Sequence, residues 1–231
     1  MKKKRVLIGK TTGLKVKSCF LLLLTTTLLI LSCSSPPLSA APAEYYADPA
    51  KVTFEQFKSP EGQFSVSVPS GWNRIESYPY KTDDTINGVM IEGPENTEGA
   101  PMTIAVLHYA GTGWIKGVDH YIKMVLSTPT RLDGEKETKF SDVIFAGRKG
   151  TTFTFKKFHL VMLPFRHPPM ENGVTYEMKP PTRKVTMVVR HLVIPAKPGF
   201  YSLWFEAPED RYNEFSGTFD IVVKSFTFQE K

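Results

Sequence analysis

Alternating hydrophobic and polar positions dominate the chain from Val52 onward and predict β-strands. The run 64–68 carries an apolar residue at every second position and ends at Pro69, which is typical of a half-buried antiparallel strand. A turn signal at 59–62 joins this run to the apolar residues at 54–57, and the two segments predict a hairpin. Further strands are predicted at 89–92, 102–109, 140–146, 151–163, 183–194, 200–206 and 225–228.

Two segments have the spacing of three and four that predicts amphipathic helices. The first runs from Trp114 to Leu126, and Pro129 ends it. The second is expected to begin at Pro208, with Glu209 and Asp210 in its first turn. Its apolar stripe consists of Phe215, Phe219 and Val222, with Gly217 as a possible interruption. The order of strands and helices predicts an α+β fold, an antiparallel sheet covered by helices, in one domain over 51–231.

One long segment between two predicted strands breaks the regular pattern. Residues 164–181 hold five prolines and exceed an ordinary hairpin loop. A possible partner-binding role is assigned to the polar and aromatic residues of this proline-rich loop, Arg166, His167, Tyr176 and Lys179. The alternative is a tolerated insertion without function.

The charge of the chain is concentrated in its first residues. The whole sequence has 29 basic and 23 acidic residues, a net charge of +6, but seven basic residues lie in the first 18 positions and no acidic residue precedes Glu44. The apolar run 20–31 that follows is shorter than the roughly 20 residues that a membrane-spanning helix needs. The basic stretch and the apolar run together are typical of a signal peptide. Without them the remaining chain would be nearly neutral, which disfavours nucleic acid as a partner.

The end of the apolar run resembles the lipobox of bacterial lipoproteins. Ile30-Leu31-Ser32-Cys33 has an aliphatic residue three positions before the cysteine and a small one just before it. This resemblance implies a signal peptide over 1–32, lipidation of Cys33, and a Ser-, Pro- and Ala-rich tether over 33–50. The alternatives are an uncleaved signal anchor or a buried apolar element. We expect an extracytoplasmic protein held on a membrane by Cys33. The outer membrane is slightly preferred, because the residue after Cys33 is Ser34 and not the aspartate that favours retention in the inner membrane of enterobacteria.

Both ends of the folded part resemble the PsbP and DcrB-like superfamily. The resemblance rests on Phe64-Ser65-Val66-Ser67-Val68-Pro69-Ser70-Gly71-Trp72, on Tyr201-Ser202-Leu203-Trp204-Phe205-Glu206-Ala207-Pro208, and on Ile221-Val222-Val223-Lys224-Ser225-Phe226-Thr227-Phe228, with Tyr212 and Phe215 between the last two segments. It implies an α/β/α sandwich and a non-enzymatic envelope role, and the family brings no active site with it.

The sequence contains no motif that assigns a reaction, a metal or a cofactor. The run 111–117 follows a strand and opens a helix, but its third glycine is one place late for a dinucleotide fingerprint and its strands are predicted antiparallel. The five histidines are scattered, although His108, His159 and His191 all lie on predicted strands and could converge. The alternating acids Asp133, Glu135 and Glu137 suit a solvated turn better than a cation site.

Aromatic residues suggest one further site. A ligand groove is one interpretation, and period-two core packing is the other, for Phe153, Phe155, Phe158, Phe200, Trp204 and Phe205. The first hypothesis for function is therefore a lipid-anchored, non-enzymatic binding or assembly accessory of the cell envelope, with an envelope protein as possible partner. The alternative is a small-molecule or metal-binding envelope protein that uses the sheet face or the proline-rich loop, and an enzyme of unrecognised class comes third.

Overall fold

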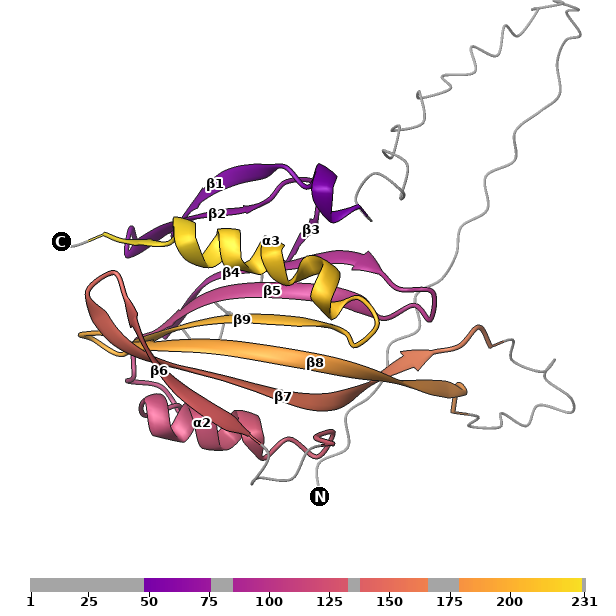
Figure 1. Cartoon of the computed structure of the whole chain (residues 1–231). Coiled ribbons are helices and arrows are strands. Elements are labelled where there is room, and N and C mark those ends of the chain that lie inside the picture. Colours follow the sequence, from indigo (N-terminus) through magenta and orange to yellow (C-terminus); the bar gives the residue numbers. More distant parts are fainter. Residues whose placement is uncertain (1–47, 76–84, 133–137, 166–178, 230–231) are drawn as a thin grey trace, which may run out of the picture. The chain divides into compact units, whose positions relative to one another are not determined.

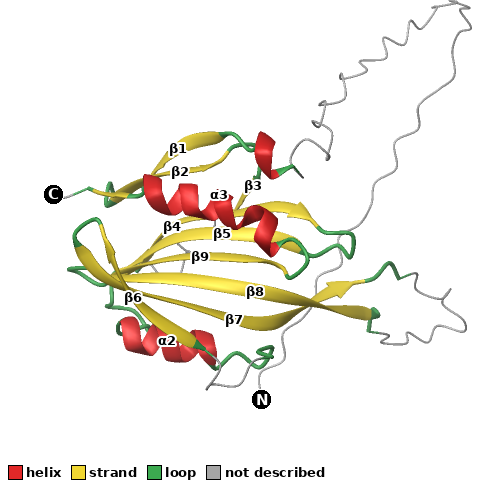
Figure 2. Ribbon diagram, viewed as in Figure 1, coloured by secondary structure: helices red, strands yellow, loops and turns green. Residues whose placement is uncertain are grey.

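A computed structural model describes residues 48–75, 85–132, 138–165 and 179–229. The predicted signal peptide, Cys33 and most of the tether lie outside these ranges, as do Arg166, His167 and Tyr176. Within them the chain forms two antiparallel sheets and two α-helices (Figures 1 and 2). The predicted α+β class, an antiparallel sheet covered by helices, is confirmed.

The larger sheet has seven strands in the described part of the chain. In spatial order these are β3 (Asn73–Ile75), β4 (Ile86–Glu95), β5 (Pro101–Tyr109), β9 (Phe200–Pro208), β8 (Thr182–Pro195), β7 (Arg148–Met162) and β6 (Lys139–Phe145). Strands β6 to β9 form a meander, whereas β5 pairs with β9, so that Thr103 faces Glu206 and Tyr109 faces Phe200. The middle of the sheet is therefore formed by two strands, β5 and β9, that lie far apart in the sequence.

A smaller sheet, which the sequence pattern did not predict as a separate unit, lies on one side of the larger one. It has the order β1 (Phe54–Lys58), β2 (Phe64–Pro69) and β10 (Thr227–Phe228), after a short 3-10 helix η1 (Pro49–Lys51). The predicted hairpin is confirmed, since β1 and β2 pair with Phe54 opposite Pro69. Strand β10 pairs with β2 and brings the C-terminal end of the chain to its first strands.

The helices cover opposite faces of the larger sheet. Helix α3 (Tyr212–Ser225) packs on β9 and β2, while α2 (Val118–Leu126) packs on β8 (Figure 1). Strand β9 lies between them and is buried on both sides. Its alternate side chains Tyr201, Leu203 and Phe205 join the α3 core, and Phe200 and Trp204 join the α2 core.

The α3 face is densely packed with aromatic side chains. The predicted stripe Phe215, Phe219 and Val222 is completely buried, and the ring of Phe219 stacks on Phe205 at 5.7 Å between centroids. Trp72 belongs to the same core, and its ring lies 6.1 Å from that of Phe215. A Cβ atom added to Gly93 would lie 2.6 Å from the Trp72 ring, so only glycine allows the indole to pack there.

Both helices begin later than their patterns predicted. Helix α2 starts at Val118 with Gly117 as its N-cap, and Trp114, the expected first residue, is 59% exposed. Pro208 is the last residue of β9, opposite Met187, because strand pairing continues through it. The chain then turns before α3 begins at Tyr212, and Gly217 does not interrupt the helix. Among the described residues, no helix is both long enough and apolar enough to cross a membrane.

Candidate functional site

A cleft between α2 and the larger sheet, here called the α2 cleft, is the best candidate for a functional site. Its volume is about 250 Å³. The helix side supplies Tyr121, Met124, Val125 and Thr128, and the sheet supplies Tyr109, Phe155, Lys157, Val189, His191, Trp204 and Glu206. Helix α2 has nine residues, and only Tyr121 among them is fully buried. The short helix therefore covers the sheet incompletely and leaves the cleft.

Strand register brings the sheet residues of the cleft together. His191 on β8 lies opposite Trp204 on β9, and one alternation further along Val189 lies opposite Glu206. Phe155 on β7 pairs with Val189. Because side chains alternate across a strand, all five point to the α2 face. Period two thus places aromatic rings, an imidazole and a carboxylate side by side, although they come from three strands.

A chain of hydrogen bonds crosses the floor of the α2 cleft. The Ser202 hydroxyl donates to the Tyr121 hydroxyl oxygen at 2.7 Å, and that hydroxyl lies 3.3 Å from His191 Nδ1. Since the tyrosine oxygen already accepts from Ser202, its own proton is available for His191. All three side chains are at least nine-tenths buried. The network therefore fixes the imidazole ring from below and joins α2 to both β8 and β9.

The imidazole of His191 is neutral at physiological pH. Burial lowers its pKa from 6.5 to about 3, and the nearby charge of Lys157 acts in the same direction. In the neutral ring, Nδ1 accepts from Tyr121, which assigns the proton to Nε2. The ring stacks on Phe153, with centroids 4.9 Å apart and planes within 8°. His191 therefore behaves as part of an aromatic wall that carries one N–H donor.

A shielded ion pair forms another part of the cleft wall. Lys157 Nζ lies 2.7 Å from Glu206 Oε2, and the Glu206 side chain is 10% exposed. The neighbouring pair between Lys156 and Glu209 has the same length but lies in the open, with its side chains about half exposed. Because water screens the first pair less, its charges act more strongly on a molecule in the cleft.

Only some of the aromatic residues that suggested a ligand groove lie in the α2 cleft. Phe155 and Trp204 line the α2 cleft, and Phe153 and Phe200 belong to the same buried cluster beneath it. Phe205 lies on the opposite face, in the α3 core. Phe158 also falls outside the cleft, since it lies three positions after Phe155 and strand side chains alternate between faces.

The strand histidines do not converge. His191 lies in the α2 cleft, whereas His108 pairs with Tyr201 on the opposite face of the sheet, and His159 lies further along β7 opposite Val185. No group of three residues able to hold a metal occurs among the described residues. Of the predicted partner residues, only Lys179 is described, and it is exposed just before β8.

Sequence reasoning missed the polar residues of the cleft. Lys157, Ser202 and Glu206 occupy inward positions of strands whose neighbours on the same face are apolar, such as Phe155 and Trp204. A polar residue at an inward position was the available signal. It could not show which of these residues meet, because their meeting depends on the order of strands in the sheet.

Two solved structures are similar to this chain at low sequence identity. No protein-family model and no curated protein sequence matches the chain. It is similar to the solution structure of cyanobacterial PsbP (CyanoP) from Synechocystis sp. PCC 6803, with a TM-score of 0.41 and 11% identity, over 77% of this chain and 93% of that one. A crystal structure from Bacteroides thetaiotaomicron VPI-5482 has a TM-score of 0.36 and 13% identity, over 77% of this chain and 49% of that one.

Proposed function

We propose that this chain is a lipid-anchored, extracytoplasmic envelope protein that binds a small molecule in the α2 cleft. The observation that carries the binding role is the cleft itself, a concave site with aromatic walls and a few converging polar groups. Binding on the sheet face is the alternative that the sequence left open, and the cleft favours it over a metal site.

The groups in the cleft are arranged for binding, with no activated nucleophile among them. The Ser202 hydroxyl donates to Tyr121, and no base is bonded to it that would take its proton on attack. Burial keeps the pKa of His191 at about 3, so the imidazole is a poor base at neutral pH. The arrangement therefore supports a non-enzymatic role.

The walls define the kind of ligand. Phe155, Trp204 and Met124 offer apolar contact to a flat molecule, and the Lys157–Glu206 pair offers both a donor and an acceptor at the edge. A volume of about 250 Å³ suits one or two fused rings. We expect a neutral aromatic molecule with a hydroxyl or amide group, for which 2-naphthol is a suitable probe.

Methionine-methyl NMR of the full-length protein in nonionic detergent tests this role. Titration with 2-naphthol is expected to shift the methyl signal of Met124 in the cleft saturably, while Met102, buried in the α3 core, stays unchanged. The variant Val125→Phe fills the cleft and should abolish the shift. Ile221→Phe makes a similar change on the exposed side of α3 and should leave it intact.

Two results would contradict the binding role. One is a Met124 shift that rises linearly without saturation, which would indicate partition of the probe into detergent. The other is equal binding by Val125→Phe and the unaltered protein, which would place the probe elsewhere. Assigned spectra of Cys33→Ser, which lacks the lipid, give a further control for detergent effects.

The anchoring part of the proposal rests on the sequence pattern ending in Cys33. Labelled palmitate should enter the protein in growing bacteria and be lost in Cys33→Ser, while Cys19→Ser should retain the label because Cys19 lies in the predicted signal peptide. Mass spectrometry of the membrane fraction should find a modified N-terminal cysteine. An unmodified Cys33 or a retained leader in the membrane-bound protein would refute the anchor.

A second candidate function, docking of an envelope protein, is favoured by the end of the β7–β8 hairpin. Near the end of β7, Met162 is 74% exposed and Leu160 is 48% exposed. The proline-rich loop at 164–181 joins β7 to β8. Crosslinking in intact envelopes should capture a partner that is lost when the loop is deleted. Replacement of Met162 by serine should weaken the crosslink, whereas Ile144→Ser, an equally exposed change on β6, should not.

A further inference from the structure

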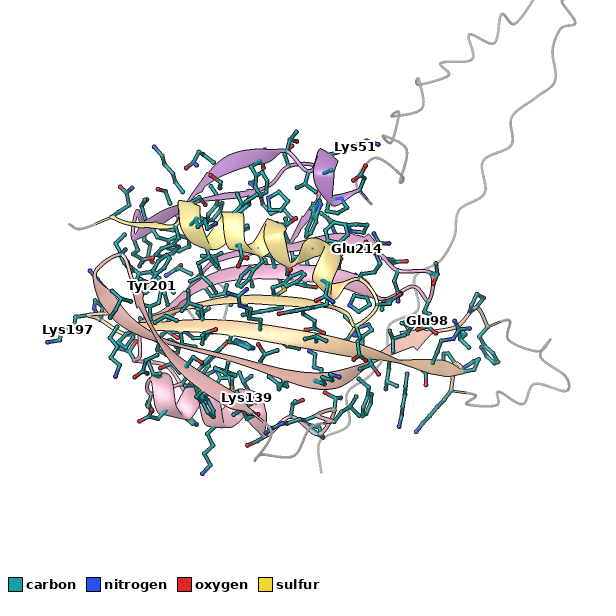
Figure 3. The ribbon with its side chains drawn as sticks, viewed as in Figure 1. Lys51, Glu98, Lys139, Lys197, Tyr201 and Glu214 are labelled. Carbon is teal, nitrogen blue, oxygen red and sulfur yellow. The ribbon has the colours of Figure 1, made fainter. Side chains whose placement is uncertain are left out.

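A second cavity, here called the end cavity, lies where the small sheet meets one end of the large sheet. Its volume is about 490 Å³, almost twice that of the α2 cleft. Its walls come from the start of β7, the end of β5, the β8–β9 turn and the beginning of β9, together with the end of β10 and the residues just before β2 and just after β10. Figure 3 shows Lys197 and Tyr201, two of its residues, at this end of the sheet.

Among the described residues, the fixed charges in the lining of the end cavity are positive. Arg148 and Lys197 line it, and no aspartate or glutamate of the described ranges does. Glu61 is an acid near the cavity: it accepts a hydrogen bond from the Gln63 side chain and acts electrostatically on His108, but it does not line the cavity. Two cations around a recess attract a negatively charged ligand.

The guanidinium of Arg148 is held in position by an aromatic ring. Its central carbon lies 4.1 Å from the centroid of the Phe228 ring, a cation–π contact that also orients the plane of the group. The Phe228 ring in turn packs against Tyr201, with centroids 5.3 Å apart. Planar guanidinium groups bind carboxylate and phosphate oxygens through paired N–H donors, so an oriented arginine suits an oxyanion.

The turn that carries Lys197 is also fixed. His108 Nε2 lies 3.0 Å from the carbonyl oxygen of Pro198, and burial lowers the pKa of His108, so the neutral ring donates its Nε2 proton to that carbonyl. Gly199 follows with φ of +76°, and a Cβ atom there would lie 1.7 Å from the Tyr109 carbonyl oxygen. The turn is therefore tied to β5, and Lys197 is delivered to the same end of the sheet as Arg148.

From these observations we infer that the end cavity binds a small organic oxyanion, a carboxylate or phosphate monoester of about monosaccharide size. Arg148 binds the oxygens, Lys197 adds a second positive charge from the β8–β9 turn, and the rings of Tyr201 and Phe228 face the organic part of the ligand. This site is separate from the α2 cleft, and the two lie on opposite faces of the sheet, as the alternation of Tyr201 and Trp204 along β9 shows.

Calorimetric titration of the full-length protein in nonionic detergent tests the inference. The probes are D-glucuronate, glucose 6-phosphate and neutral D-glucose. At least one anion should bind saturably and glucose should not. Lys197→Gln, at an exposed position where folding is not at risk, and Arg148→Gln should each weaken binding by about tenfold, as expected for loss of one charge-assisted hydrogen bond.

Lys149→Gln is the matched control. It removes the same charge one position from Arg148, but the Lys149 side chain pairs with Asp142 at 2.7 Å and is 68% exposed. Affinity should be unchanged in this variant and in Val125→Phe, which fills only the α2 cleft. Equal weakening by Lys149→Gln and Lys197→Gln, equal binding of glucose, or no binding of either anion at millimolar concentration would overturn the inference.

Discussion

The two faces of the large sheet differ in how completely a helix covers them. Helix α3 has 14 residues and buries four of them, whereas α2 has nine and buries only Tyr121. The α3 face is filled by phenylalanine rings, while the α2 face holds Ser202, His191 and an ion pair beside a cleft. The comparison suggests that the part of the sheet beneath α3 supplies most of the stability, which leaves the part beneath α2 able to keep polar groups and an open cleft.

The largest expected effect is on the α3 face. Replacing Phe219, which is completely buried, by alanine should lower the free energy of unfolding by about 3–5 kcal/mol through lost burial and the cavity left behind. Urea unfolding followed by circular dichroism measures this change. Ile221→Ala, on the exposed side of the same helix, should cost less than about 1 kcal/mol, and equal costs would break the comparison between faces.

On the α2 face, stability should depend on pH through His191. Its folded pKa of about 3 lies below the unfolded value of 6.5, so the unfolded state binds the proton first as pH falls. Stability is therefore fully present above pH 6.5 and is lost on acidification, with a contribution of about 1.4 kcal/mol per pH unit between these values.

Urea unfolding at several pH values between neutral and mildly acidic, in the unaltered protein and in His191→Gln, isolates this effect because other titrating groups are common to both. The variant should show a shallower dependence. His120→Gln, on the exposed side of α2, should keep the slope of the unaltered protein. A variant at residue 191 with an unchanged slope would show that the buried imidazole is not the group responsible.

The next effect compares two adjacent lysines. Lys157→Met leaves the shielded Glu206 without its partner and should cost about 2 kcal/mol, less than a fully buried pair because Lys157 is partly exposed. Lys156→Met removes a cation from the exposed Glu209 and should cost about 0–1 kcal/mol. Thermal melting ranks the two variants, and a larger loss for Lys156→Met would contradict the shielding of the cleft.

The smallest expected effect is stabilising. Gly217 lies within α3, and a Cβ atom there would meet nothing within 4 Å. Gly217→Ala should therefore raise the free energy of unfolding by about 0.5–1 kcal/mol, since alanine restricts the unfolded chain and favours helix. Urea unfolding measures it. The reverse comparison, Gly93→Ala, should destabilise the protein because the added carbon would strike Trp72.

Local patterns predicted the elements of this fold better than their limits or their partners. The strand at 64–68 and the stripe of Phe215 and Phe219 could be predicted because alternation and helical spacing are local. The start of α3 could not, since Pro208 is well suited to a first helical turn and only its pairing with Met187 keeps it in β9. Tertiary contacts decided between two locally acceptable states.

The candidate sites were less predictable than the fold. Tyr121 lies within the helix predicted from Trp114 to Leu126, but the partners of its hydroxyl, Ser202 and His191, lie far along the chain. Arg148 begins β7 and Lys197 lies in the β8–β9 turn, and nothing local indicates that they line one cavity. Sites of this kind arise from strand order, which a single sequence does not display.

The pairing of β5 with β9 has a consequence for how the chain is made. Thr103 cannot pair with Glu206, nor β2 with β10, until the intervening residues, about 100 of them for Thr103, have been synthesised. At translation rates of about 5–20 residues per second, the edge of β5 stays open for on the order of ten seconds. An unpaired strand edge is open to aggregation during that interval. Strands β9 and β10 thus also protect the edges of β5 and β2 against misassembly.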